Sequence, residues 1–327
     1  MAEPDLGATA AAVRRFDPDL FATALFAPEP ARAWLLTLYA FDIELSRAAQ
    51  RASRAEEGPM IAAMRLQWWR DQIAAAVEAC HAEGVEVHVW KVNWNLSNAS
   101  EDFINKMRSQ GRTQVDVHGE ELDWLCPSHP MNYELERESM LEVARNYNVD
   151  GIHFDYIRYP DETTCYCDGC RERFEKDTGN EVTNWPMECY KGRLAAEYRD
   201  WRVQQITRLV RGISEAVEEE NLEVEISAAV FHNYPDCRRS VGQDWVDWAE
   251  KGYVDFLVPM NYTNSSGEFE TWVTGQVGLV GDTVPLHPGI GVSSSNSRLT
   301  PDQAIHQVRL ARELGAKGFT LFNYDAD

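Results

Sequence analysis

Apolar and polar positions alternate along residues 149–160, in the middle of the chain. Ile152 and Phe154 fall on one side of this stretch, and His153 and Asp155 fall on the other, which is the two-residue period of a buried β-strand. A barrel strand needs one apolar face and places polar groups at its carboxyl end, where the active site opens. Asp155 is therefore the first catalytic candidate, and the alternative is a buried carboxylate in a structural ion pair.

The hydrophobic pattern divides the rest of the chain near residue 76. Before that point the apolar residues recur at helical spacing, and after it helices and strands alternate. Six strands separated by helices predict a parallel sheet whose polar residues collect at the strand carboxyl ends. The pattern predicts helices at residues 17–26 and 31–51, a helix from residue 60, one ended by Gly84, and others at 132–146, 188–220, 245–251 and 301–314. The strands besides the central one are expected at residues 85–92, 222–231, 254–260, 284–291 and 317–322.

Composition narrows the class of partner. The 327 residues carry a formal charge of −22, which repels phosphate backbones, so nucleic acid is not expected as a partner. No apolar run reaches the length of a transmembrane span, and no export signal is visible at the N-terminus. With 44% hydrophobic residues, the chain can build a sizeable core. Its seven cysteines do not indicate a compartment, and neither localisation nor oligomeric state is predicted.

The N-terminal helical region resembles the opening of the squalene/phytoene synthase family. The resemblance covers residues 14–75 and is carried by the runs at residues 16–21, 24–28, 38–41 and 64–71, the last reading Met-Arg-Leu-Gln-Trp-Trp-Arg-Asp. That family binds magnesium diphosphate through two Asp-rich motifs. Asp42 matches the first carboxylate, but Ser46 stands where a second Asp is needed. The resemblance therefore predicts a helical fragment over residues 1–75 without synthase activity.

Residues 76–327 resemble the family-10-like glycosyl hydrolases. The matching stretches are residues 84–94, 150–160, 173–179, 255–262 and 318–324. The resemblance implies a (β/α)8 barrel that acts on a polysaccharide or on peptidoglycan glycan, with Asp155 in the reaction centre. Its members are generally exported. The first two strands of that barrel are missing here, so we expect an incomplete TIM-type barrel of strands three to eight and a chimeric join near residues 71–80.

Glycosidic cleavage usually takes two carboxyl groups on either side of the bond. A separation of about 5–5.5 Å predicts retention, and about 6.5–9.5 Å predicts inversion. Asp155 is one candidate, and Asp325, just after the last strand, is the other. Glu268, in the loop after the strand at 254–260, is an alternative partner, and each of these two acids is also typical of a solvated loop.

Aromatic and amide side chains follow the predicted strands. Sugar rings present apolar faces to aromatic rings and hydroxyl groups to amides, so these residues are predicted to line the substrate site. Arg158 either clamps the substrate or keeps Asp155 ionised. The predicted lining consists of Trp90, Asn93, Trp94, Asn95, Tyr156, Arg158, Asn261, Tyr262, Asn323 and Tyr324.

Three cysteines, Cys165, Cys167 and Cys170, lie close together after the central strand. Three thiols bind zinc if a fourth ligand such as Cys189 or His232 comes near. A disulfide or reduced thiols are the alternatives. No cofactor is required for the expected reaction, and zinc is the one metal that the cluster suggests.

The sequence thus favours a glycoside hydrolase with a carbohydrate substrate. A barrel that binds carbohydrate without cleaving it is the alternative, because the second carboxylate has no motif of its own. A third interpretation makes the N-terminal helices an isoprenoid-synthase-like interaction module in an inactive chimeric chain.

Overall fold

The computed structural model describes residues 10–11, 13–15 and 59–322, which fall into two compact units. The first unit comprises residues 1–87, 100–102 and 324–327, and the second comprises 88–99 and 103–323. The helices predicted at 17–26 and 31–51 lie outside the described residues. In the first unit, helix α4 spans Pro59–Ala82, and Gly84 follows it with a φ of +70°. Glycine adopts that left-handed conformation without steric cost, so Gly84 ends the helix as expected.

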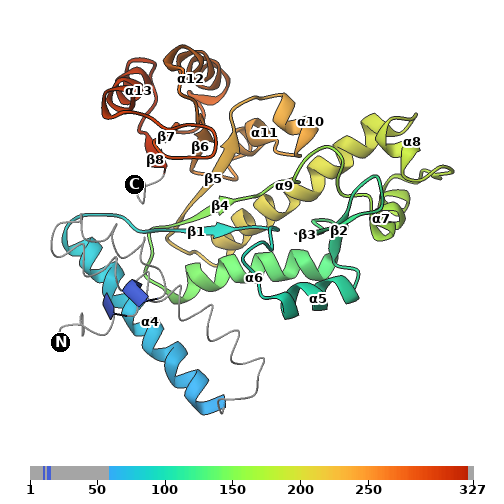
Figure 1. The fold of residues 1–327 in the computed structure, drawn as a ribbon, viewed down its shortest axis with the longest axis horizontal. Helices are drawn as coiled ribbons and strands as arrows, with labels where there is room; N and C mark the ends of the chain where they lie inside the picture. The colour runs from blue at the N-terminus through green and yellow to red at the C-terminus, as the bar shows by residue number, and fades with distance from the viewer. Residues whose placement is uncertain (1–9, 12, 16–58, 323–327) are drawn as a thin grey trace. The chain divides into compact units, whose positions relative to one another are not determined.

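The second unit is built on a six-stranded parallel sheet in the order β1-β4-β5-β6-β7-β8 (Figure 1). This confirms the predicted incomplete (β/α) barrel. The strands begin later than the hydrophobic pattern suggested, because the amino ends of the predicted segments are loops. The sheet consists of β1 (His88–Val92), β4 (Gly151–Asp155), β5 (Glu225–Phe231), β6 (Phe256–Met260), β7 (Gly289–Gly291) and β8 (Thr320–Phe322).

Helices connect the strands and cover the sheet. Helix α6 packs on β4 and on α9, and α12 packs on α13. Thr300 begins α13 with a capping box, in which its hydroxyl accepts from the Gln303 backbone N–H and the Gln303 side chain accepts in return. The helices of this region are α5 (Glu101–Ser109), α6 (Pro130–Asn146), α7 (Asp168–Thr178), α8 (Met187–Tyr190), α9 (Ala195–Glu219), α10 (Asp236–Ser240), α11 (Trp245–Glu250), α12 (Ser266–Val280) and α13 (Pro301–Glu313).

Several elements of the second unit differ from the prediction. Helices α5, α7, α10 and α12 have no predicted counterpart. An antiparallel hairpin, β2 (Thr113–Val115) and β3 (Glu121–Leu125), occupies a region in which no element was predicted. The helix predicted at residues 188–220 is interrupted between α8 and α9. Gly192 lies in the interruption, and a Cβ there would come within 2.7 Å of the Glu188 backbone. The tight turn therefore accepts glycine and no larger residue.

The core of the second unit is a large apolar cluster between the sheet and its helices. Trp245 and Trp248 of α11 are fully buried within it, and the Trp248 indole N–H donates to Thr207 Oγ1 over 2.9 Å. A smaller cluster joins α12, α13 and β7 around Phe269 and Ile290. Among the described residues, no helix is both long and apolar enough to cross a membrane.

Strands β1 and β8 form the two ends of the described sheet. Their side chains nevertheless meet, because the ring centroids of Trp90 and Phe322 lie 6.2 Å apart in an edge-on arrangement. The sheet therefore curves so far that its first and last strands touch through side chains. In this curved sheet the carboxyl ends of all six strands lie at one end, as the candidate site requires.

Candidate active site

Asp155 is the last residue of β4 and is 8% exposed. Its Oδ2 accepts a hydrogen bond from the Trp90 indole N–H over 2.9 Å, and its Oδ1 accepts one from the Tyr156 backbone N–H over 2.7 Å. Burial raises the pKa of this carboxyl group, and those two N–H groups and the charge of Arg158 oppose the rise. The result is a desolvated carboxyl group that holds its proton to higher pH than a solvated aspartate.

The backbone is strained on both sides of this carboxyl group. Tyr156 has a φ of +52°, and Trp94, beyond the end of neighbouring β1, has a φ of +64°. The two strands are adjacent, since Val92 pairs with Asp155. A side chain other than glycine in this region costs on the order of 1–3 kcal/mol, and such residues cluster at functional sites. The strained residues thus indicate that the functional site lies at the carboxyl ends of β1 and β4.

A cationic group surrounded by aromatic rings forms one side of the site. The Arg158 guanidinium lies 5.4 Å from the ring centroid of Trp124, 4.9 Å from that of Tyr156 and 4.8 Å from that of Phe231. Its Nη1 donates to the carbonyl oxygens of the two following residues. Arg158 therefore acts on Asp155 through charge, by lowering its pKa. The hairpin residue Trp124 was missed because no element was predicted in its segment.

Another part of the site comes from the end of β8 and from Tyr262, just after β6. The Tyr262 ring stacks on Phe322 with centroids 5.1 Å apart, and Phe322 also meets Trp90 edge-on. Burial and the nearby charge of Asp155 raise the pKa of the Tyr262 hydroxyl. Trp90 itself is 56% exposed although its N–H binds the buried carboxyl group. A half-exposed indole thus lies directly beside Asp155.

Two of the predicted lining residues, Asn93 and Trp94, are fully buried and bind a carboxylate that the sequence analysis missed. Glu136, on α6, accepts from Asn93 Nδ2 over 2.7 Å and from the Trp94 backbone N–H over 3.4 Å. It also pairs with Lys91 of β1. Glu136 is 4% exposed, so it fixes the loop after β1 from within. A glutamate on an amphipathic helix gives no sequence signal for such a role.

Asn261 and Asn95 also make internal hydrogen bonds. The Asn261 side-chain amide exchanges two hydrogen bonds with that of Gln276, of 3.0 and 2.8 Å, and is fully buried. Asn95 accepts from the Ser97 backbone N–H and bridges to Trp124 of the hairpin. These two amides hold loops next to the aromatic side chains.

The proposed partner carboxylate, Asp325, lies outside the described residues, as do Asn323 and Tyr324. Glu268 is exposed in the first turn of α12, and its Oε2 accepts from the Thr263 hydroxyl over 2.6 Å. The prediction that Glu268 lies in a loop is therefore wrong, because the residue belongs to helix α12.

His153 lies on the same face of β4 as Asp155. Its Nδ1 is 2.8 Å from the Ser227 hydroxyl of β5. Burial and the neighbouring His88 lower the pKa of His153 to about 4. It is a neutral, hydrogen-bonded histidine at physiological pH.

The three cysteines singled out in the sequence come together with a fourth. Their thiols group with that of Cys126, which follows β3 and stands 41 residues before Cys167. Neither Cys189 nor His232, suggested as the fourth ligand, belongs to this group. The distant position of Cys126, with no other cysteine beside it, hid this role in the sequence.

Comparisons with known proteins agree with the geometry. The model of the family described as glycosyl hydrolase-like 10 matches residues 55–277, so its match begins before residue 76. The chain is 21% identical over 282 residues to the glycosyl hydrolase YngK of Bacillus subtilis, covering 75% of this chain and 51% of that protein. It is 27% identical over 206 residues to an S-layer-related protein of Niallia circulans, covering 51% of this chain and 13% of that protein.

Two solved structures share the fold. The PgaB glycoside hydrolase domain of Bordetella bronchiseptica has a TM-score of 0.58 at 16% identity, covering 78% of this chain and 74% of that one. A GH42 β-galactosidase from G. stearothermophilus also has a TM-score of 0.58, at 12% identity, covering 78% and 43%. The chain spans about half or less of the curated relatives described above. The resemblance of residues 14–75 to squalene/phytoene synthases, and the inferred join, stay predictions.

Proposed function

Because the chain belongs to the glycosyl hydrolase-like 10 family, we propose that it hydrolyses glycosidic bonds in a polysaccharide or in peptidoglycan glycan. Asp155 supplies one of the two carboxyl groups of this reaction. The proposal concerns the second unit alone, because Asp155 and the rings around it all belong to that unit.

The observation that carries the proposal is the pair formed by Trp90 and Asp155. The Trp90 side chain is half exposed while its N–H holds a buried carboxyl group. A sugar ring stacked on that indole would place its glycosidic oxygen beside the carboxyl group. Tyr262 and Phe322 supply the apolar wall on the other side.

The raised pKa of Asp155 suits the general acid of this reaction. A general acid must hold a proton near the working pH and give it to the leaving oxygen as the glycosidic bond breaks. Burial favours the protonated form, while the Trp90 and Tyr156 N–H groups stabilise the carboxylate left after transfer. The second carboxyl group, which activates water or attacks the sugar, is proposed to be Asp325.

The test compares the wild-type chain with Asp155→Asn on a panel of polysaccharides and peptidoglycan, with reducing ends as the readout. Loss of a catalytic carboxyl group is expected to lower the rate by about 100-fold or more while glycan binding is retained. Exposed Asp282→Asn is the matched control and should keep full activity. Glycan binding without turnover in the wild type would indicate a carbohydrate-binding barrel, and equal turnover in Asp155→Asn would refute the assignment.

A further inference from the structure

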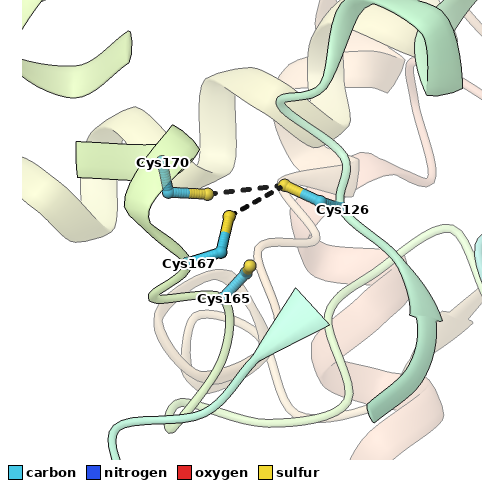
Figure 2. A group of neighbouring side chains, drawn as sticks. All are labelled: Cys126, Cys165, Cys167 and Cys170. Atoms are coloured by element: carbon cyan, nitrogen blue, oxygen red, sulfur yellow. Dashed lines mark hydrogen bonds between the residues drawn. The ribbon is translucent and has the colours of Figure 1, made fainter. Parts of the chain in front are cut away.

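Four buried thiols meet between the hairpin and the loop after β4 (Figure 2). All four sulfur atoms lie within 4.8 Å of one another, and none forms a disulfide. Cys126 Sγ is 3.4 Å from Cys170 Sγ and 3.9 Å from Cys167 Sγ. Cys165 completes the group and is fully buried.

These spacings match a metal tetrahedron. Zinc binds thiolate sulfur at about 2.3 Å, which places the sulfur atoms of a tetrahedral site about 3.8 Å apart. A disulfide would bring two of them to about 2.05 Å. Four soft sulfur ligands disfavour magnesium and calcium, which take oxygen, and favour zinc.

We propose that Cys126, Cys165, Cys167 and Cys170 bind one zinc ion in a closed tetrahedral site. The four thiols lose their protons on binding, so the site carries two negative charges. Four protein ligands leave no position for water or substrate, and the role is therefore structural. The site goes beyond the proposed hydrolase function and does not depend on it.

Neighbouring side chains suit a negatively charged metal site. Arg173 Nη2 lies 3.7 Å from Cys126 Sγ, and its Nε donates to the Ser128 hydroxyl over 2.9 Å. That hydroxyl is 3.2 Å from both Cys126 Sγ and Cys170 Sγ. A buried hydroxyl and a half-buried guanidinium thus supply hydrogen bonds and positive charge to the sulfur atoms, as the outer partners of metal ligands do.

The chain around the cysteines also suits the site. Cys167 is the N-cap of α7, and its side chain makes no capping hydrogen bond, so its sulfur is available to a metal. The positive end of the helix dipole favours a thiolate at this position. Cys170 lies in the first turn of the same helix. One turn of helix therefore presents two ligands to the metal.

The zinc site would join two segments that flank the active site. The loop after β4 already pairs with the hairpin, since the Tyr166 backbone N–H donates to Val115 O over 2.7 Å. Cys126 follows two residues after Trp124, whose ring lies 5.6 Å from that of Tyr156. Zinc would hold this tryptophan against the end of β4.

The first experiment measures metal in the full chain, purified without chelators or metal resins. We expect about one zinc ion per chain, released by a thiol-specific mercurial. Titration in denaturant and chelator should find all seven thiols free. A zinc-free protein that binds no added zinc when reduced would overturn the proposal, as would a disulfide among the four cysteines.

The second experiment replaces one ligand. Cys126→Ser should lower zinc affinity, and it should weaken and shift the intense visible bands that tetrahedral thiolate gives after cobalt substitution. Cys237→Ser is the matched control, because Cys237 is equally buried, lies outside the group, and donates to Gln243 O in a contact that serine can keep. Unchanged zinc affinity in Cys126→Ser would overturn the ligand assignment. Chelation should lower the unfolding midpoint of the wild type and leave that of Cys126→Ser unchanged.

Discussion

Replacing Glu136 by alanine should destabilise the second unit by about 2–4 kcal/mol. The change leaves the fully buried Asn93 Nδ2 without its acceptor, which costs about 1–3 kcal/mol. It also leaves Lys91 unpaired, but the Lys91 side chain is 23% exposed and can recover part of its hydration. The expected loss therefore lies at the lower end of the range for breaking a buried ion pair.

Glu136→Gln removes the negative charge of the side chain but keeps an oxygen that can accept a hydrogen bond, so it tests the two contributions separately. Its remaining oxygen can still accept from Asn93, while the new amide group faces the Trp94 backbone N–H, which is also a donor. We expect a loss of about 1–2 kcal/mol. Adding Lys91→Met to Glu136→Gln should then cost less than Lys91→Met alone, because the ion pair is already broken.

Urea unfolding followed by circular dichroism and tryptophan fluorescence measures these free energies, provided that the two transitions coincide. Glu134→Ala, at an exposed position on the same helix, is the control and should stay within about 0.5 kcal/mol of the wild type. If Glu136→Ala lost no more stability than Glu134→Ala, the role assigned to this carboxylate in fixing the loop after β1 would be wrong.

Three further predictions concern the site and the helix layer. Trp90→Phe removes an N–H that lowers the pKa of Asp155, so the limb of the pH–rate profile that Asp155 controls should move to higher pH, and an unmoved limb would contradict the assignment. Burial raises the pKa of Asp155 in the folded chain. In urea titrations the wild type should therefore lose stability relative to Asp155→Asn as the pH rises from about 4 through that pKa. A relative stability that rises with pH would refute this prediction. Gly212→Ala places a Cβ 2.2 Å from Tyr133 Oη and should lower the free energy of unfolding by about 1–3 kcal/mol, with partial rescue by Tyr133→Phe. Gly278→Ala meets no atom within 4 Å and should raise the free energy of unfolding by about 0.5–1 kcal/mol in the same assay.

The six strands of the sheet and their order were predictable because each strand has its own apolar pattern, whereas helices such as α7 and α12 were not predicted. Asp155 stood out for the same reason, since the period of two places it at the end of a buried strand. The hairpin was missed because β2 is three residues long and its apolar pattern is too short to read. Two residues of this region were missed with it. Trp124 completes the aromatic rings around Arg158, and Cys126 completes the group of four thiols.

Partners that lie far apart in sequence were beyond prediction. Glu136 binds Asn93, 43 residues away, and no local pattern links a helix surface to a loop behind a strand. The roles of Asn261 and Asn93 also depend on burial, which the sequence does not show. An asparagine after a strand has the same pattern whether it faces a substrate or a neighbouring glutamine.

The meeting of Trp90 and Phe322 across the ends of the described sheet has a consequence for motion. Adjacent parallel strands are held by backbone hydrogen bonds, but β1 and β8 touch through two rings, and such an aromatic pair contributes only about 0.5–1.5 kcal/mol beyond its buried area. Amide protons of β1 and β8 should therefore exchange with solvent faster than those of β4 and β5. Asp155 binds Trp90 of β1, and Tyr262 stacks on Phe322 of β8, so motion between these two strands would change the contacts of both site residues.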